Sequence, residues 1–167
     1  MNKNCLFLIT GFLLIFSTHL RGFEKVEISQ LVSSVGVSVD NSALLIRCLE
    51  DKRCWVSGED LISVPHQPCS TAKIPHTLIA LEVGYAKDPH KVFKWDGQKR
   101  FLDVWNKDHT LESAFKQSTL WVYQKITSDL GCEEMSSWIG KLNYGNRFIG
   151  GDGDITTYWL DGPLAIS

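Results

Sequence analysis

The pattern of apolar and polar residues changes character at about residue 70. Before that point, short apolar or β-branched segments alternate with polar turns, which is typical of β-strands. The segments are 36–39, 43–47 and 55–56, with turns at 40–42 and Gly58. They predict two or three adjacent strands, preceded by a short helix over residues 28–34.

After residue 70, apolar residues recur at helical spacing. Helices are expected over 78–83, 111–115, 120–126 and 135–142, with Gly84 ending the first and Gly131 separating the last two. Strands followed by helices predict an α+β fold, in which the N-terminal strands of a mixed, helix-flanked sheet are joined to a helical region. A length of 167 residues fits one domain.

The first 22 residues have the layout of a secretory signal peptide. Lys3 precedes an apolar run from Cys5 to Phe16, and a polar stretch ends at Gly22. The run is too short for a stable membrane span, although an uncleaved anchor is the alternative. We therefore expect a signal peptide over 1–22, a domain over 23–167, no stable membrane span after cleavage, and a periplasmic or secreted protein.

Charge and cysteine content bear on three possibilities: a nucleic-acid partner, a disulfide and a metal site. The formal net charge is −2 and becomes more negative without residues 1–22, so nucleic acid is not an expected partner. Cys48 and Cys54 flank a charged turn and are expected to form a disulfide in an exported protein. A metal site is rejected, because the spacings of the cysteines match no zinc pattern.

The segment Ser70-Thr-Ala-Lys73 is the strongest candidate for chemistry. Three residues are about one helical turn, so Ser70 and Lys73 would share a face, with Ser70 at a helix N-terminus. Burial would lower the pKa of the lysine and make it a competent base for the serine. The alternative is a helix N-cap followed by an exposed lysine. Pro75 is a local conflict in such a helix.

Several further elements accompany this motif in a fixed order. Residues 70–82 begin Ser-Thr-Ala-Lys-Ile-Pro, and residues 92–97 read Val-Phe-Lys-Trp-Asp-Gly. Ser118-Thr-Leu120, Tyr144-Gly145-Asn146 and Trp159-Leu-Asp161 follow. Together these elements closely resemble the class D (oxacillinase-type) serine β-lactamases, which are related to penicillin-binding transpeptidase domains. The resemblance covers nearly everything after residue 22.

The resemblance implies a chemical role for each of these positions. Ser70 would attack a β-lactam carbonyl and form an acyl-enzyme, and Ser118 would relay a proton to the β-lactam nitrogen. Lys73 would be carboxylated by carbon dioxide and act as the general base, with no other cofactor. Trp159 would donate its indole N–H to this carbamate, and Leu120 and Ile74 would line the pocket.

Other positions carry less chemistry or depart from the family. Tyr144, Gly145 and Asn146 would line the substrate site, although a plain turn is the preferred interpretation. His66 and His76 have no nucleophile to pair with, so a structural role is expected for both. Two departures are Ala72, where the family has an aromatic residue, and Leu120, where it has valine.

The resemblance also implies that the C-terminal sheet strands, with their Lys-Thr/Ser-Gly element, are absent from residues 1–167. The chain alone is therefore expected to be unstable or poorly active. The leading function is hydrolysis of β-lactams, which confers antibiotic resistance. The alternatives are a penicillin-sensing module with slow deacylation, an inactive truncated remnant and, less favoured, a transpeptidase.

Overall fold

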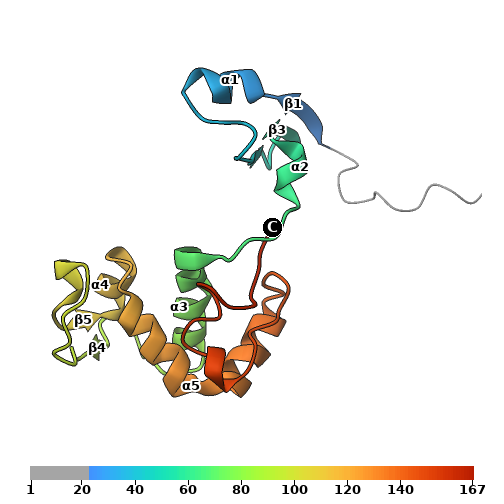
Figure 1. The fold of residues 1–167 in the computed structure, drawn as a ribbon. Helices are drawn as coiled ribbons and strands as arrows, with labels where there is room; N and C mark the ends of the chain where they lie inside the picture. The colour runs from blue at the N-terminus through green and yellow to red at the C-terminus, as the bar shows by residue number, and fades with distance from the viewer. Residues whose placement is uncertain (1–22) are drawn as a thin grey trace, which may run out of the picture. The chain divides into compact units, whose positions relative to one another are not determined.

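The computed structural model describes residues 23–167, which divide at Val64 into two compact units (Figure 1). The first unit contains a three-stranded sheet and two short helices, and the second is mainly helical. This is an α+β fold with strands first and helices after, as predicted. The signal peptide expected over residues 1–22 lies outside the described residues. Among the described helices, none is both long and apolar enough to cross a membrane.

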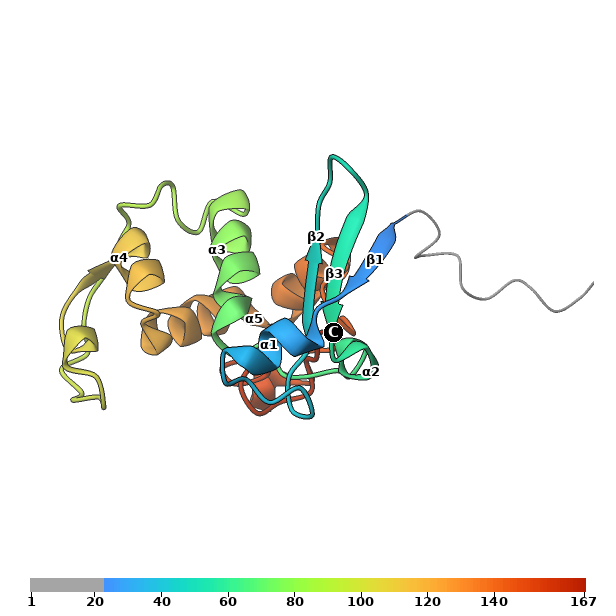
Figure 2. The same cartoon turned by 90° about the horizontal axis from the view of Figure 1, so that it is seen from above.

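The sheet of the first unit has the order β1-β3-β2 (Figure 2). The predicted hairpin is confirmed as β2 (Leu44–Arg47) and β3 (Arg53–Ser57), which run antiparallel. Strand β1 (Glu24–Glu27) pairs parallel with β3 and was not predicted. It has three charged residues and one valine, so its four residues show no alternation that would distinguish a strand from a loop.

The predicted strand over 36–39 is wrong. The expected helix is present as α1 (Ser29–Ser34), and the residues after it form its C-terminal cap. Gly36 has a φ of 82° and donates to Ser33 O at 3.0 Å, while Val37 donates to Val32 O at 3.4 Å. This is a Schellman motif, which uses the backbone N–H groups that a strand would need.

The predicted disulfide is not formed, and both Cys48 and Cys54 are free thiols. In the β2–β3 register, Arg47 lies opposite Cys54. Cys48 is the next residue and donates its N–H to Arg53 O at 2.9 Å, so it faces Arg53 rather than Cys54. Because side chains alternate between the faces of a hairpin, the two thiols are offset from a bridging position.

The helices of the second unit form as predicted, with shifted ends. They are α3 (Lys73–Glu82), α4 (Leu111–Lys116) and α5 (Leu120–Lys141). Gly84 follows α3 with a φ of 73°, and Gly131 interrupts α5 with a φ of 78° and a ψ of 168°. Both angles suit glycine, which lacks the Cβ that makes them costly for other residues.

Several short elements were not predicted. They are α2 (Glu59–Ile62), β4 (Val92–Phe93), β5 (His109–Thr110) and three 3₁₀ segments, Cys69–Ala72, Asp103–Trp105 and Asp152–Asp154. Strands β4 and β5 pair with each other across a loop. Elements of this length carry too few residues for a periodic pattern, so the sequence signal is weak.

The core of the second unit lies where α3 and α5 pack together and where residues 155–164 return to them (Figure 1). Its fully buried large side chains include Ile79 of α3, Tyr123, Ile126 and Ile139 of α5, and the neighbouring pair Tyr158 and Trp159. Burial of each such side chain stabilises the fold by about 1.5–3 kcal/mol. This core holds the start of α3, and with it the candidate nucleophile.

Candidate active site

Ser70 and Lys73 lie together, as their spacing predicted. The 3₁₀ segment Cys69–Ala72 leads directly into α3, which begins at Lys73. Lys73 Nζ donates to Ser70 Oγ at 3.0 Å. Ser70 is exposed whereas Lys73 is 3% exposed, so the hydroxyl faces solvent and the amine lies beneath it. A nucleophile held beside a buried amine is the arrangement that activates a serine.

The backbone around Ser70 is fixed from both sides. Cys69 has a φ of 48° and donates its N–H to Trp159 O at 2.8 Å. A non-glycine residue in this region costs about 1–3 kcal/mol, and such residues cluster at functional sites. Pro75 causes no conflict, because it is in the first turn of α3, where N–H groups have no partner within the helix.

The Lys73 amine is buried and has no ion-pair partner among the described residues. Burial lowers the pKa of its amine below the usual range, since the charged form loses hydration. Its Nζ lies 5.6 Å from the centre of the Tyr123 ring. Thr77 joins the two residues, donating to Lys73 O at 2.7 Å and contacting Tyr123 Oη at 2.8 Å.

Ser118 reaches Ser70 from the end of another helix. Its hydroxyl donates to Ser70 Oγ at 3.1 Å, so two donors converge on the candidate nucleophile. Ser118 has a φ of 52° and follows α4 in a Schellman motif. Its N–H donates to Phe115 O at 3.1 Å, and Thr119 N–H donates to Ala114 O at 2.8 Å. The cap turns the chain so that the side chain meets Ser70.

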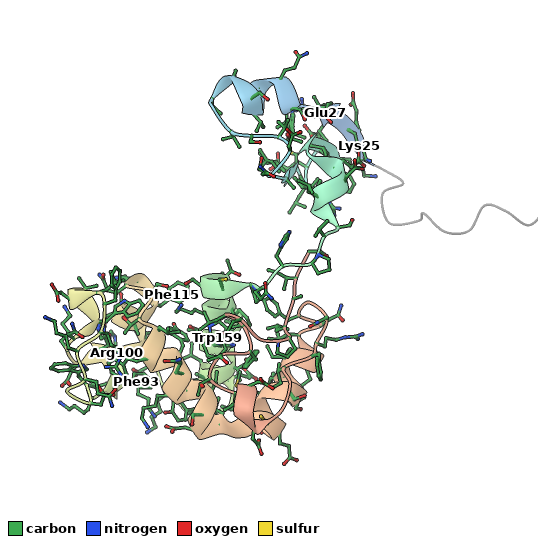
Figure 3. All side chains as sticks on the ribbon, viewed as in Figure 1. Lys25, Glu27, Phe93, Arg100, Phe115 and Trp159 are labelled. Carbon is green, nitrogen blue, oxygen red and sulfur yellow. The ribbon has the colours of Figure 1, made fainter. Side chains whose placement is uncertain are left out.

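The Trp159 side chain lies within the second unit (Figure 3). It is fully buried, and its indole Nε1 has no hydrogen-bond partner among residues 23–167. A buried donor without an acceptor costs about 1–3 kcal/mol, so this atom marks a position suited to an acceptor. The described residues therefore fit a carboxylated Lys73 on three counts. The amine is buried, its pKa is lowered, and the expected indole donor is unpaired.

Ile74 and Leu120, the two apolar residues predicted to line the lysine pocket, differ in burial. Ile74 is 53% exposed on α3, so it is not part of the buried core, and its place in the pocket remains a prediction. Leu120 is the first residue of α5 and packs, partly buried, against the core. Its role beside Lys73 remains a prediction. Ala72, the departure from the family pattern, is fully buried in the core.

His76 lies in the same buried cluster, which the sequence did not predict. Its Nε2 is 2.6 Å from Tyr158 Oη, and its ring centre is 4.7 Å from that of Trp159. Burial, and secondarily the charge of Lys73, lower its pKa to about 3, so the imidazole is neutral near pH 7. The signal was its position three residues after Lys73, on the same face of α3.

Tyr144, Gly145 and Asn146 form a turn that is hydrogen-bonded to residues 163–165. Asn146 Nδ2 donates to Pro163 O at 2.8 Å, and its backbone N–H donates to Ala165 O at 2.9 Å. A Cβ at Gly145 would collide with the carbonyl oxygen of Ala165, so this turn requires glycine. The three residues line a cavity of about 610 Å³ whose lining residues do not include Ser70, Lys73 or Ser118. Their predicted contact with substrate remains a prediction.

The site thus places a serine hydroxyl beside a buried lysine, an arrangement that can serve a serine nucleophile. Among residues 23–167, no cluster of three or more histidine, cysteine or acidic side chains is arranged to hold a metal ion. Two proton-carrying side chains, those of Lys73 and Ser118, contact Ser70 Oγ. Such a set can deprotonate a hydroxyl and pass a proton to a leaving group.

Comparisons with known proteins agree with this chemistry. The family model of the penicillin-binding protein transpeptidase domain matches residues 52–167. β-Lactamase OXA-48 of Klebsiella pneumoniae is 48% identical over 100 residues, covering 60% of this chain and 37% of the relative. The probable β-lactamase YbxI of Bacillus subtilis is 36% identical over 127 residues, covering 76% and 47%.

Solved structures give the same result. The class D β-lactamase YbXI from Nostoc superposes with a TM-score of 0.78 at 32% identity, covering 84% of this chain and 57% of that one. FUS-1 (OXA-85) from Fusobacterium nucleatum gives 0.77 at 35% identity, covering 84% and 56%. The resemblance to class D β-lactamases is thereby confirmed. The chain spans less than half the length of the curated relatives it matches.

Proposed function

Since the chain belongs to the penicillin-binding protein transpeptidase family, we propose that it carries the nucleophile part of a class D-type β-lactam-hydrolysing site. Ser70 is the nucleophile. The supporting observation is the convergence of Lys73 Nζ and Ser118 Oγ on Ser70 Oγ, at 3.0 and 3.1 Å. Substrates are β-lactams, whose strained ring carbonyl accepts a serine hydroxyl.

Acylation needs two proton transfers, one away from Ser70 and one to the β-lactam nitrogen, and a separate side chain serves each. Ser70 Oγ bonds to the ring carbonyl carbon, and its proton leaves on the side of Lys73. The carbon–nitrogen bond of the ring then breaks, and the nitrogen takes a proton through Ser118. Both side chains are within hydrogen-bond reach of Ser70 Oγ, at 3.0 and 3.1 Å, which supports these two transfers.

Carboxylation of Lys73 is part of the proposal. The neutral amine adds to carbon dioxide, forming a nitrogen–carbon bond and losing one proton to solvent. The resulting carboxylate would supply a base for the serine in acylation and for water in deacylation. Burial of Lys73, with its lowered pKa, and the unpaired Trp159 Nε1 support this step.

Export belongs to the same proposal. β-Lactams act outside the cytoplasm, and residues 1–22 have the layout of a signal peptide. A protein placed in the periplasm or the medium would meet the drug before its target does. Resistance to β-lactams would follow from hydrolysis there.

Bicarbonate dependence tests the proposal. Dilution in carbon dioxide-free buffer should remove the carboxylate from Lys73. Turnover of a chromogenic β-lactam by the diluted chain should therefore rise when bicarbonate is added. Lys73→Ala should abolish turnover and the response, whereas Lys94→Ala, at an exposed lysine, should retain both. A flat response in the active wild type would contradict carboxylation.

A further inference from the structure

Trp159 lacks the hydrogen bond that would hold its indole in place. Among the described residues, three buried side chains leave a polar atom unpaired, and Trp159 and His76 are two of them. The backbone of Trp159 is anchored, since its carbonyl accepts from Cys69 N–H at 2.8 Å. The direction of the indole N–H therefore depends on the side chains packed against the ring.

Two aromatic side chains provide this packing. The His76 ring lies 4.7 Å from the Trp159 ring at 80°, and the Tyr158 ring lies 4.9 Å away, also at 80°. His76 and Tyr158 are themselves edge to face, at 5.5 Å and 65°. Three mutually tilted rings, all fully buried, leave the indole little freedom to rotate.

His76 is in turn fixed by Tyr158 and by its own helix. Its Nε2 is 2.6 Å from Tyr158 Oη, and this bond sets the plane of the imidazole. Tyr158 is held through its backbone, which donates to Asp154 O at 2.7 Å and accepts from Leu164 N–H at 3.1 Å. His76 thus links α3, which carries Lys73, to the segment that carries Trp159.

We propose that His76 is a positioning residue, which holds the Trp159 indole with its N–H available to the carboxylate formed on Lys73. The inference rests on the proposed carboxylation of Lys73. The imidazole is neutral near pH 7, so His76 acts on Trp159 through the packing of its ring and its bond to Tyr158 rather than through charge. His76 touches no reacting atom, and it acts through Trp159.

The test measures the carboxylated lysine and the indole separately. Carboxylation is followed by ¹³C NMR of the chain in ¹³C-bicarbonate, without substrate. The indole is followed by its ¹⁵N–H resonance, assigned with Trp159→Phe. His76→Gln removes the ring and keeps a polar group, and Tyr158→Phe keeps both rings and removes the hydrogen bond.

His109→Gln is the matched control. His109 is also buried, bonds through both ring nitrogens to Ser113 and Val104, and lies edge-on to Trp121 at 6.0 Å. It lies on β5, away from Lys73 in the chain and outside the cluster of His76. A general loss of packing should therefore affect it as much as His76.

The proposal predicts that His76→Gln raises the half-saturating bicarbonate concentration about tenfold, the lower end of the effect of groups that orient a ligand. Tyr158→Phe should raise it less, and His109→Gln should leave it unchanged. The Trp159 indole resonance should be sharp in the wild type and shifted or broadened in His76→Gln.

The two ideas fail in different ways. A wild type without a carbamate signal would contradict the proposed function, and the indole resonance would still report on the positioning. An unchanged indole resonance in His76→Gln would overturn the positioning role. So would an unchanged bicarbonate midpoint in a wild type that does form the carbamate.

Discussion

The hydroxyl oxygen of Ser118 lies 3.1 Å from that of Ser70, although 48 positions separate the two residues. The contact depends on a left-handed residue at the end of α4, where helices usually place glycine. The serine is therefore strained where its hydroxyl is needed. At this position, glycine should favour the stability of the fold, whereas serine should favour the rate of acylation.

Substitutions at Ser118 should therefore affect stability and acylation rate differently. Ser118→Gly should be about 1 kcal/mol more stable than Ser118→Ala, because glycine adopts a φ of 52° without strain. Both variants should lose the proton relay and acylate more slowly than the wild type. Urea unfolding gives the stability, and the rate of adduct formation gives the chemistry.

An interior helical serine provides the control for that comparison. At Ser128 in α5, glycine should be less stable than alanine by about 1 kcal/mol. If the order at Ser118 were the same as at Ser128, the strained C-terminal cap would be contradicted.

The lowered pKa of Lys73 predicts a pH dependence of carboxylation. Only the neutral amine adds to carbon dioxide, and below the pKa of the folded state its fraction falls about tenfold per pH unit. At fixed dissolved carbon dioxide, activity should therefore fall toward acid, and added carbon dioxide should move the acid limb to lower pH. An acid limb independent of carbon dioxide would rule out this assignment.

The buried His76 predicts a pH dependence of stability. Its pKa is about 3 in the folded state, against 6.5 for a free histidine. Between these values the unfolded chain binds a proton that the folded chain does not, so stability falls as pH falls below 6.5. The slope from this site approaches about 1.4 kcal/mol per pH unit.

Substitutions at two histidines test whether this pH dependence of stability arises from His76. His76→Gln should lack this part of the acid sensitivity, whereas His66→Gln, at an exposed residue, should keep it. Urea midpoints at several pH values between 4 and 7, about the window set by the two pKa values, give the comparison. Equal slopes in the wild type and His76→Gln would show that His76 is not held neutral.

The free thiols of the first unit should be detectable directly. Cys48 is partly exposed and Cys54 is buried, so alkylation of the native chain should label Cys48 quickly and Cys54 slowly. After unfolding without reductant, both should react. Protection of both in the unfolded chain would restore the disulfide that the strand register argues against.

The sequence was sufficient where the interaction was local. The contact between Ser70 and Lys73 follows from a spacing of three residues in a helix, and Gly84 ends α3 as predicted. The hairpin of β2 and β3 likewise follows from two apolar segments around a charged turn. Each of these features is determined by neighbours within about one turn or one hairpin.

The rest depends on contacts between distant segments. The pattern around Ser118 does not indicate Ser70 as its partner, and only the family resemblance did so. The sequence indicates a structural role for His76, since nothing pairs it with a nucleophile. It does not identify the partners, Tyr158 and Trp159, because they come more than 80 residues later. The Cys48–Cys54 error arose because spacing alone does not give the register of a hairpin.

Intact mass spectrometry of the purified chain after incubation with a penicillin tests Ser70 as the nucleophile. We predict one covalent adduct, equal in mass to the intact drug, in the wild type and none in Ser70→Ala. The lifetime of the adduct would then distinguish hydrolysis from slow release. A folded wild type that forms no adduct, or an adduct that persists in Ser70→Ala, would contradict Ser70 as the nucleophile.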